Sequence, residues 1–392
     1  MPNTAVAMSP RVLRWAREQA ALSVQEVARR LGKDSTDIEE WEGGDSAPTY
    51  VQLEKLAYEI YKRPLALFFF PEPPVETDLQ QEFRTLPDEE FCELLPDTRL
   101  AIREALARRA SLEEVCGGSN PAERFLLREV QVTAPRKPEE VAGLVRGHLQ
   151  ITMREQESWR STDAALKSWR EAVERAGVFV FKRSLRQKSI SGFCLANAEF
   201  PVVYLNNSTP QTRQIFTLFH ELAHALLCVS GITFRDDQFI ERLDDPFKAI
   251  EIFCNRFAGE VLVPSDEFAR HRSVREWSDE QVSSIADSYK VSREVVLRRA
   301  LDWGLVSKEF YRRKAREWAD QAKPRDGGGG DYYATQATYF GQAFLTLLFT
   351  QRQRGRFSIE EVAEHLGMKV PNALKLEDYF LTRSPEPNDL RV

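Results

Sequence analysis

The sequence predicts a mainly α-helical protein with a small antiparallel β-sheet, which is an α+β fold class. Three observations lead to this prediction. Apolar residues recur at helical spacing along most of the chain. Three short runs rich in β-branched and aromatic residues interrupt that pattern between residues 177 and 205. Proline- and glycine-rich breaks separate the helical stretches from one another.

Length and composition exclude several classes of protein. The chain has 392 residues, enough for two to four domains. A net charge of −6 excludes a globally basic nucleic-acid coat protein. The five cysteines are scattered and form no C-x-x-C pair, which argues against a disulfide framework and against a zinc finger built from cysteines. They suit a reducing compartment, so we expect a cytoplasmic protein. We expect neither a signal peptide nor a membrane partner, because no apolar run is long enough.

Residues 1–72 predict a helix-turn-helix domain made of short helices. Ser23 and Glu26 form a capping box, in which each side chain satisfies the other residue's free backbone N–H. Apolar residues follow at helical spacing until Gly32. A helix, a tight turn and a further helix within this length are typical of helix-turn-helix domains.

The rest of the chain divides at breaks in its pattern. Small helical units recur along it, but we find no strict sequence repeat. The expected parts are a helical connector over 73–135, a core domain over 136–272, a helical subdomain over 273–323, a flexible linker over 324–330 and a helical C-terminal tail over 331–392.

The core domain contains the expected sheet and two long helices. The three strands are expected over 177–182, 190–195 and 200–205. Thr209 then suggests an N-cap, with Pro210 at the first position of a helix that runs to about residue 229. A second long helix is expected over 246–261, ending before a proline.

The first of these helices carries an H-E-x-x-H motif formed by His220, Glu221 and His224. Positions i and i+4 lie on one face of a helix, so the two imidazoles can converge on one Zn²⁺ ion. The glutamate lies beside the metal and can take a proton from the attacking water and pass it to the leaving amine. The motif therefore predicts a zinc-dependent hydrolase with Glu221 as its catalytic residue.

The context of the motif strengthens this interpretation. The chain has only five histidines, and two of them stand at this spacing. The flanking residues are apolar nearly all round the helix, which indicates that it is buried. Two histidines and a glutamate are costly to bury unless a metal or hydrogen bonds compensate. A polar cluster satisfied by hydrogen bonds alone is the alternative.

A catalytic zinc site needs a third protein ligand. No third histidine follows at the spacing that some zinc peptidases use, so we expect an acidic residue. Glu251 flanks an apolar stripe on the second long helix and should face the core, whereas Glu260 near the end of that helix could be solvated. The candidates are Glu241, Asp244, Asp245, Glu251 and Glu260.

Two segments carry a family resemblance. Residues 216–227 (FTLFHELAHALL) and 251–264 (EIFCNRFAGEVLVP) resemble the two signature helices of the ImmA/IrrE family of zinc metallopeptidases. The resemblance implies a gluzincin-like core with His220, His224 and Glu251 as zinc ligands. Asn255 is a candidate to orient a ligand by hydrogen bonding. Ala223 and Gly259 depart mildly from the family pattern, and we interpret Cys254 as a buried structural residue.

The resemblance also implies a substrate, because relatives cut a helix-turn-helix repressor once and so release transcription. We therefore expect a site-specific endopeptidase that regulates transcription or a stress or mobile-element response. Fold logic suggests that a substrate peptide adds to the strand over 201–206, just before the motif helix.

Residues 8–70 resemble Xre/Cro-type helix-turn-helix domains, on the Trp41-Glu42-x-Gly44 element and the Pro48-Thr49 that follows it. Operator DNA is therefore one expected partner, with Arg29, Arg30 and Lys33 as candidate contacts. The charge of this segment argues against DNA binding. Residues 36–46 contain five acidic residues and no basic one, and acidic side chains repel phosphate. The alternatives are a domain for homodimerisation or one that holds a partner, such as a toxin-like protein.

A competing function remains open from the sequence. The chain could be a non-proteolytic helix-turn-helix regulator or an antitoxin-like binding protein, with a structural or vestigial metal site.

Overall fold

The computed structural model describes residues 8–74, 79–83, 87, 91–132, 136–234, 238–321 and 331–383. The chain divides into two compact units, one made of residues 1–104 with 185–187 and the other of residues 105–184 with 188–392. The expected linker over 324–330 lies outside the described residues, and the other expected domain limits stay predictions.

The first unit begins with short helices, and capping residues in the sequence mark their ends. The Ser9 side chain accepts a hydrogen bond from the Val12 N–H, and Ser23 and Glu26 form the expected capping box. Gly32 ends its helix in the left-handed conformation, with φ of 71°. Apolar side chains from these helices form a separate core. The elements are α1 (Pro10–Gln19), α2 (Val24–Leu31), α3 (Ser35–Gly43), α4 (Tyr50–Glu54), the π-helix η1 (Lys55–Tyr61), the 3-10 helix η2 (Leu65–Phe69) and α5 (Leu79–Glu82).

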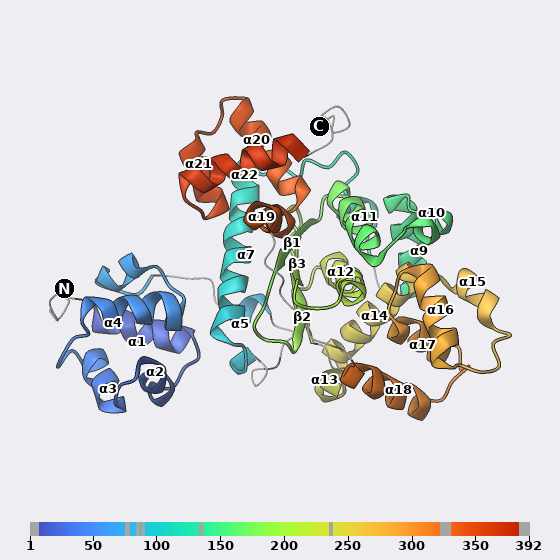
Figure 1. The fold of residues 1–392 in the computed structure, drawn as a ribbon, viewed down its shortest axis with the longest axis horizontal. Coiled ribbons are helices and arrows are strands. Elements are labelled where there is room, and N and C mark those ends of the chain that lie inside the picture. The colour runs from blue at the N-terminus through green and yellow to red at the C-terminus, as the bar shows by residue number, and fades with distance from the viewer. Residues whose placement is uncertain are drawn as a thin grey trace. The chain divides into compact units, whose positions relative to one another are not determined.

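The second unit contains most of the helices and the sheet (Figure 1). Helix α7 (Pro96–Val115) contributes residues to both units. The helices before and around the sheet are α8 (Leu126–Glu129), α9 (Pro138–Leu149), α10 (Met153–Ser158), α11 (Thr162–Arg175), α12 (Gln211–Leu226), α13 (Gln238–Arg242) and α14 (Asp245–Leu262). Those that follow are α15 (Ser265–Phe268), η3 (Ala269–His271), α16 (Asp279–Tyr289), α17 (Arg293–Asp302), α18 (Lys308–Gln321), α19 (Tyr332–Phe340), α20 (Gln342–Gln353), α21 (Ile359–Leu366) and α22 (Val370–Arg383).

The sheet is mixed, so the antiparallel arrangement expected from the sequence holds for two of its three strand pairings and not for the third. Its strands are β1 (Phe179–Arg183), β2 (Ile190–Leu195), β3 (Val202–Asn206) and β4 (Gly231–Phe234), in the order β1-β3-β2-β4. β3 runs antiparallel to β2 and parallel to β1. The parallel pair arises because β3 lies between β1 and β2 and runs in the same direction as β1. The mainly α-helical character with a small sheet is confirmed.

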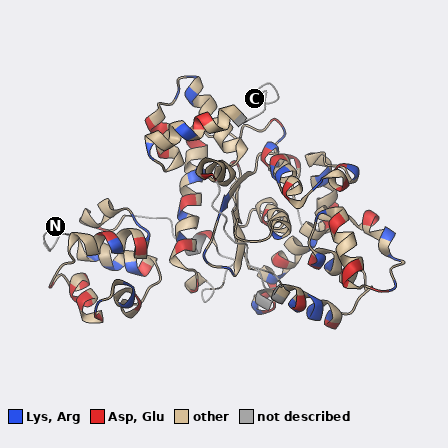
Figure 2. Cartoon of the chain, viewed as in Figure 1, with Lys and Arg blue, Asp and Glu red and all other residues tan. Residues whose placement is uncertain are grey.

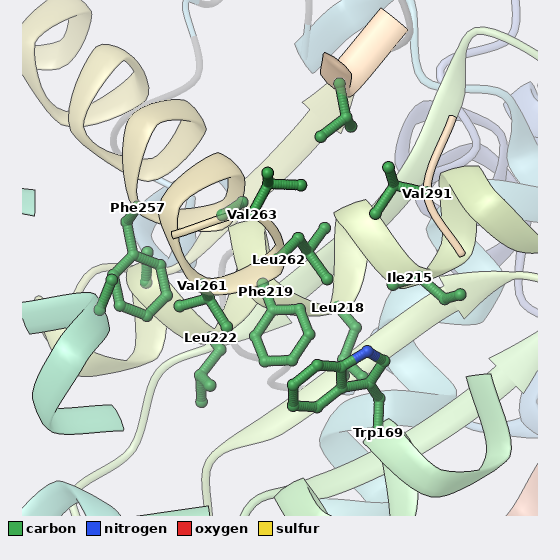
Figure 3. Packing of buried hydrophobic residues seen from close by; sticks show 14 of the residues in the cluster. Trp169, Ile215, Leu218, Phe219, Leu222, Phe257, Val261, Leu262, Val263 and Val291 are labelled. Atoms are coloured by element: carbon green, nitrogen blue, oxygen red, sulfur yellow. The ribbon is translucent and has the colours of Figure 1, made fainter. Parts of the chain in front are cut away.

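Helix α12 packs closely against the sheet, with α14 on its other side. A Cβ atom on Gly192 of β2 would lie 2.7 Å from the Thr217 side chain of α12, so the glycine permits this approach. Phe219 and Leu222 of α12 meet Phe257 and Val261 of α14 in the main core (Figure 3). This packing fixes the two long helices side by side, and it therefore fixes the residues that they carry.

Across the described residues, no helix combines the length and the apolar character that a membrane span requires.

Candidate metal centre

Helix α12 buries the whole H-E-x-x-H motif. His220, Glu221 and His224 are each at most 1% exposed. The helix begins one residue later than expected, because Pro210 is its N-cap residue and the Thr209 hydroxyl instead donates to the Asn206 carbonyl. The two imidazoles lie one turn apart, with their Nε2 atoms 3.2 Å from each other.

Helix α14 brings Glu251 to the same place. One carboxylate oxygen of Glu251 lies 3.2 Å from Nε2 of His220, and the other lies 3.2 Å from Nε2 of His224. Glu251 is 5% exposed, as its place beside the apolar stripe predicts. Two ring nitrogens and a carboxylate from two helices therefore converge on one buried point.

The chemistry and spacing of these donors fit a small divalent cation. Tetrahedral zinc with bonds of about 2.0–2.1 Å would hold its ligand atoms roughly 3.3 Å apart, close to the three separations of 3.2 Å here. Oε2 of Glu221 is also buried without a hydrogen-bond partner in the described part of the chain. Such atoms are costly in an apolar core, and a bound cation with its water would offset part of that cost.

Two further residues of α14 face α12. Asn255 Oδ1 lies 3.0 Å from Nδ1 of His220. With the proton on Nδ1, this hydrogen bond leaves Nε2 free to ligate a metal. Cys254 is buried, and its ligand atom lies within 4.8 Å of those of His220 and His224. A thiolate there is a potential ligand, a role that the sequence did not suggest.

The charges of the site favour an ionised Glu251. Burial raises the pKa of its carboxyl, but the contacts with His224 and His220 outweigh burial and hold that pKa well below its usual range. At His220, burial is the largest cause of the pKa shift. It lowers the imidazole pKa and so favours the neutral form that a metal requires.

Glu221 is held by the edge of the sheet. The Thr233 hydroxyl of β4 donates to Oε1 of Glu221. Burial is the main cause that raises the pKa of Glu221, to about 8. A cation beside the carboxyl would act in the opposite direction, because an opposite charge favours the ionised form.

Strand β4 supplies two residues that sequence reasoning missed. Besides Thr233, Gly231 lies against the imidazole of His224, where an added Cβ would come within 2.7 Å of a ring atom. Nothing in the sequence pattern marks these positions, because β4 was not expected as a strand. For Cys254, its place three residues after Glu251 on the same helix face was the available signal.

The other acidic candidates lie elsewhere. Glu241 is exposed and pairs with Arg312 at 2.6 Å. Asp244 and Asp245 are exposed at the start of α14. Glu260 is buried rather than solvated, because it forms an ion pair with Arg299. Glu251 is the one acidic candidate that the structure places against both histidines of the motif.

Residues 173–301 match the family model Peptidase_M78, the IrrE N-terminal-like domain. This segment is 129 of the 392 residues and includes α12, β4 and α14. The match supports the ImmA/IrrE resemblance and a metallopeptidase-type function for this segment. It does not include the N-terminal helices, so their helix-turn-helix assignment stays a prediction. No curated protein matches the chain.

Proposed function

We propose that this protein is a zinc-dependent, site-specific endopeptidase that regulates transcription, in a stress or mobile-element response, by cutting a repressor-type protein. The observation that carries the proposal is the buried group of His220, His224 and Glu251, whose donor atoms lie 3.2 Å apart beside Glu221. The match of residues 173–301 to a peptidase family model supports it.

The chain's own residues divide the work of the proposed reaction. His220, His224 and Glu251 would hold the zinc, which would lower the pKa of water and polarise the scissile carbonyl. Asn255 fixes the ring of His220 in one orientation. Thr233 holds Oε1 of Glu221 and leaves Oε2 available to accept a proton from the attacking water and then pass it to the leaving amine.

The substrate peptide adds to β4 rather than to β3 in this proposal. The expected edge over 201–206 is wrong, because β3 pairs with β1 on one side and β2 on the other. β4 is the last strand of the sheet order, and its Thr233 contacts Glu221. An extended peptide paired with β4 would therefore run beside the proposed catalytic carboxylate.

Zinc analysis and a cleavage assay test the proposal. The wild-type protein should bind about one zinc per chain, and His220→Ala should lose it. The substrates to assay are helix-turn-helix repressors encoded near the gene of this protein. Wild-type protein should cut one of them at one site, whereas zinc-loaded Glu221→Gln should not. Equal cutting by both proteins would reject the mechanism, and a correctly folded protein that binds no zinc would reject the site.

One observation favours the alternative of a non-proteolytic regulator or antitoxin-like protein with a structural metal. The ligand atoms of His220, His224 and Cys254 all lie within 4.8 Å of one another. If Cys254 ligated the metal in addition to Glu251, four protein ligands would fill a tetrahedral site and leave no open position. Cobalt substitution separates the two functions. A thiolate-to-cobalt charge-transfer band that Cys254→Ala removes would favour the closed structural site, and a spectrum without that band would favour the open catalytic site.

A further inference from the structure

The two ends of the chain carry the same local structure. We compare residues 17–42, the N-terminal segment, with residues 352–377, the C-terminal segment, at a constant offset of 335. Eight of the 26 matched positions are identical. Helices α2 and α21 match residue for residue, each starts with a Ser–Glu capping box, and each ends at a glycine in the left-handed conformation. The sequence therefore contains a repeat that its helical patterning alone did not reveal.

The same ion pair, with a buried carboxylate, closes both segments. Arg17 pairs with Glu42, and Arg352 pairs with Glu377, so both pairs span 25 residues. Glu42 and Glu377 are each 6% exposed. Burial along the third helix also agrees, because each residue of 34–42 has the same burial class as its counterpart in 369–377. The two segments thus share an interior and differ on their surfaces.

The surfaces carry opposite charges at matched positions. Six positions are charged in both segments. Three keep their sign, and these are the ion pair and the capping-box glutamate. The other three are exposed in both segments, and all three reverse their sign. The reversed pairs are Arg29 with Glu364, Asp34 with Lys369, and Glu40 with Lys375. Figure 2 shows where basic and acidic residues lie along these helices.

This pattern suits a protein partner better than DNA. A helix-turn-helix domain places its second helix in the major groove and its first helix across the phosphate backbone. In each segment, one of the two helices that would contact DNA is acidic. In the N-terminal segment it is α3, and in the C-terminal segment it is α21, with Glu360, Glu361 and Glu364. Phosphates would repel either of these helices.

We propose that the C-terminal segment of one copy of this protein docks on the N-terminal segment of a second copy. Two segments with one backbone plan can pack about a local pseudo-two-fold axis, which places equivalent surfaces opposite each other. Asp34 and Glu40 then attract Lys369 and Lys375 in whichever order they face each other, whereas the acids of two identical N-terminal segments would repel there. Arg29 attracts Glu364 where these two counterparts meet at the axis. Leu374, which is 43% exposed beside Lys375 on α22, adds apolar contact to this surface.

Charge-swap variants of the full chain test this interface. The N-swap variant carries Arg29→Glu, Asp34→Lys and Glu40→Lys, and the C-swap variant carries Glu364→Arg, Lys369→Asp and Lys375→Glu. The wild-type protein should sediment as a dimer at low salt and dissociate as salt rises, because salt screens exposed charges. Either swap should raise the dimer dissociation constant by at least about tenfold, since like charges then face each other. The two swaps combined should restore the dimer.

The control is Lys167→Glu, an exposed change on α11 outside both segments, which should leave the dimer intact. Thermal unfolding followed by circular dichroism checks that each variant is folded. A wild-type protein that has the mass of a single chain at every concentration would overturn the proposal. It would also be overturned if both swap variants fold and lose the dimer, but the combined variant does not regain it. Binding of duplex DNA that the C-swap abolishes and the combined variant does not restore would also overturn it, in favour of a DNA partner.

Discussion

Two glycines near the candidate metal centre differ in the space around their Cα atoms. At Gly231 an added Cβ would come within 2.7–2.8 Å of three ring atoms of His224, closer than real Cβ contacts. At Gly259 of α14 the nearest atom would be Cδ of Arg299 at 3.5 Å, an ordinary contact. The same substitution to alanine should therefore disturb the metal centre at Gly231 and leave it undisturbed at Gly259.

We predict that Gly231→Ala lowers zinc affinity by on the order of 10–100-fold, because the new methyl group displaces the His224 ring. Competition with a chromophoric chelator measures the affinity. Gly259→Ala is the matched control and should keep the wild-type affinity. It should also raise the free energy of unfolding by about 0.5–1 kcal/mol, because glycine is unfavourable inside a helix. Equal zinc affinities for the two variants would contradict the proposed contact.

At single residues, the sequence predicted the structure correctly where the outcome depends on spacing within one helix. The capping box of Ser23 and Glu26 and the burial of Glu251 depend on spacing within one helix. The prediction failed at Glu260, whose partner Arg299 lies 39 residues away on another helix. Long-range partners such as this one leave no periodic signal in the sequence.

At the scale of elements, the Glu260–Arg299 pair joins α14 to α17. Both residues are buried, and Glu260 also accepts a hydrogen bond from the Ser265 N–H at 2.6 Å. Arg299 donates in addition to the Val263 carbonyl at 3.1 Å. Removing one partner would leave a buried charge unpaired.

We predict that Arg299→Ala lowers the free energy of unfolding by about 3–5 kcal/mol, because Glu260 would stay buried without its cation. Urea denaturation measures the change. The double variant Glu260→Gln with Arg299→Met should lose less, since it removes the charge and keeps an acceptor for Ser265. A double variant as unstable as the single one would show that packing, rather than the unpaired charge, dominates.

Elements differed in how far the sequence could define them. The long helices around residues 211–226 and 245–262 were expected within a few residues, because amphipathic periodicity and prolines mark them. Strand β4 has four residues and was missed. The position of β3 inside the sheet was also missed, because strand order depends on pairing between distant segments.

At the scale of the whole molecule, the candidate metal centre belongs to one of the two compact units. Helices α12 and α14 both lie in the unit made of residues 105–184 and 188–392. The helices α1 to α4 have a core of their own in the other unit. Where two units unfold independently, a ligand that binds one of them stabilises that unit alone.

We therefore predict that zinc shifts only part of the unfolding profile in differential scanning calorimetry. Free zinc at 100 times its dissociation constant should stabilise the second unit by about 2.7 kcal/mol, and a chelator should reverse the shift. The transition of the first unit should stay in place. His220→Ala should abolish the shift, whereas His148→Ala should keep it, because His148 on α9 contacts Arg124 and Glu129 rather than the metal centre. A zinc shift that persists in His220→Ala would place the metal elsewhere.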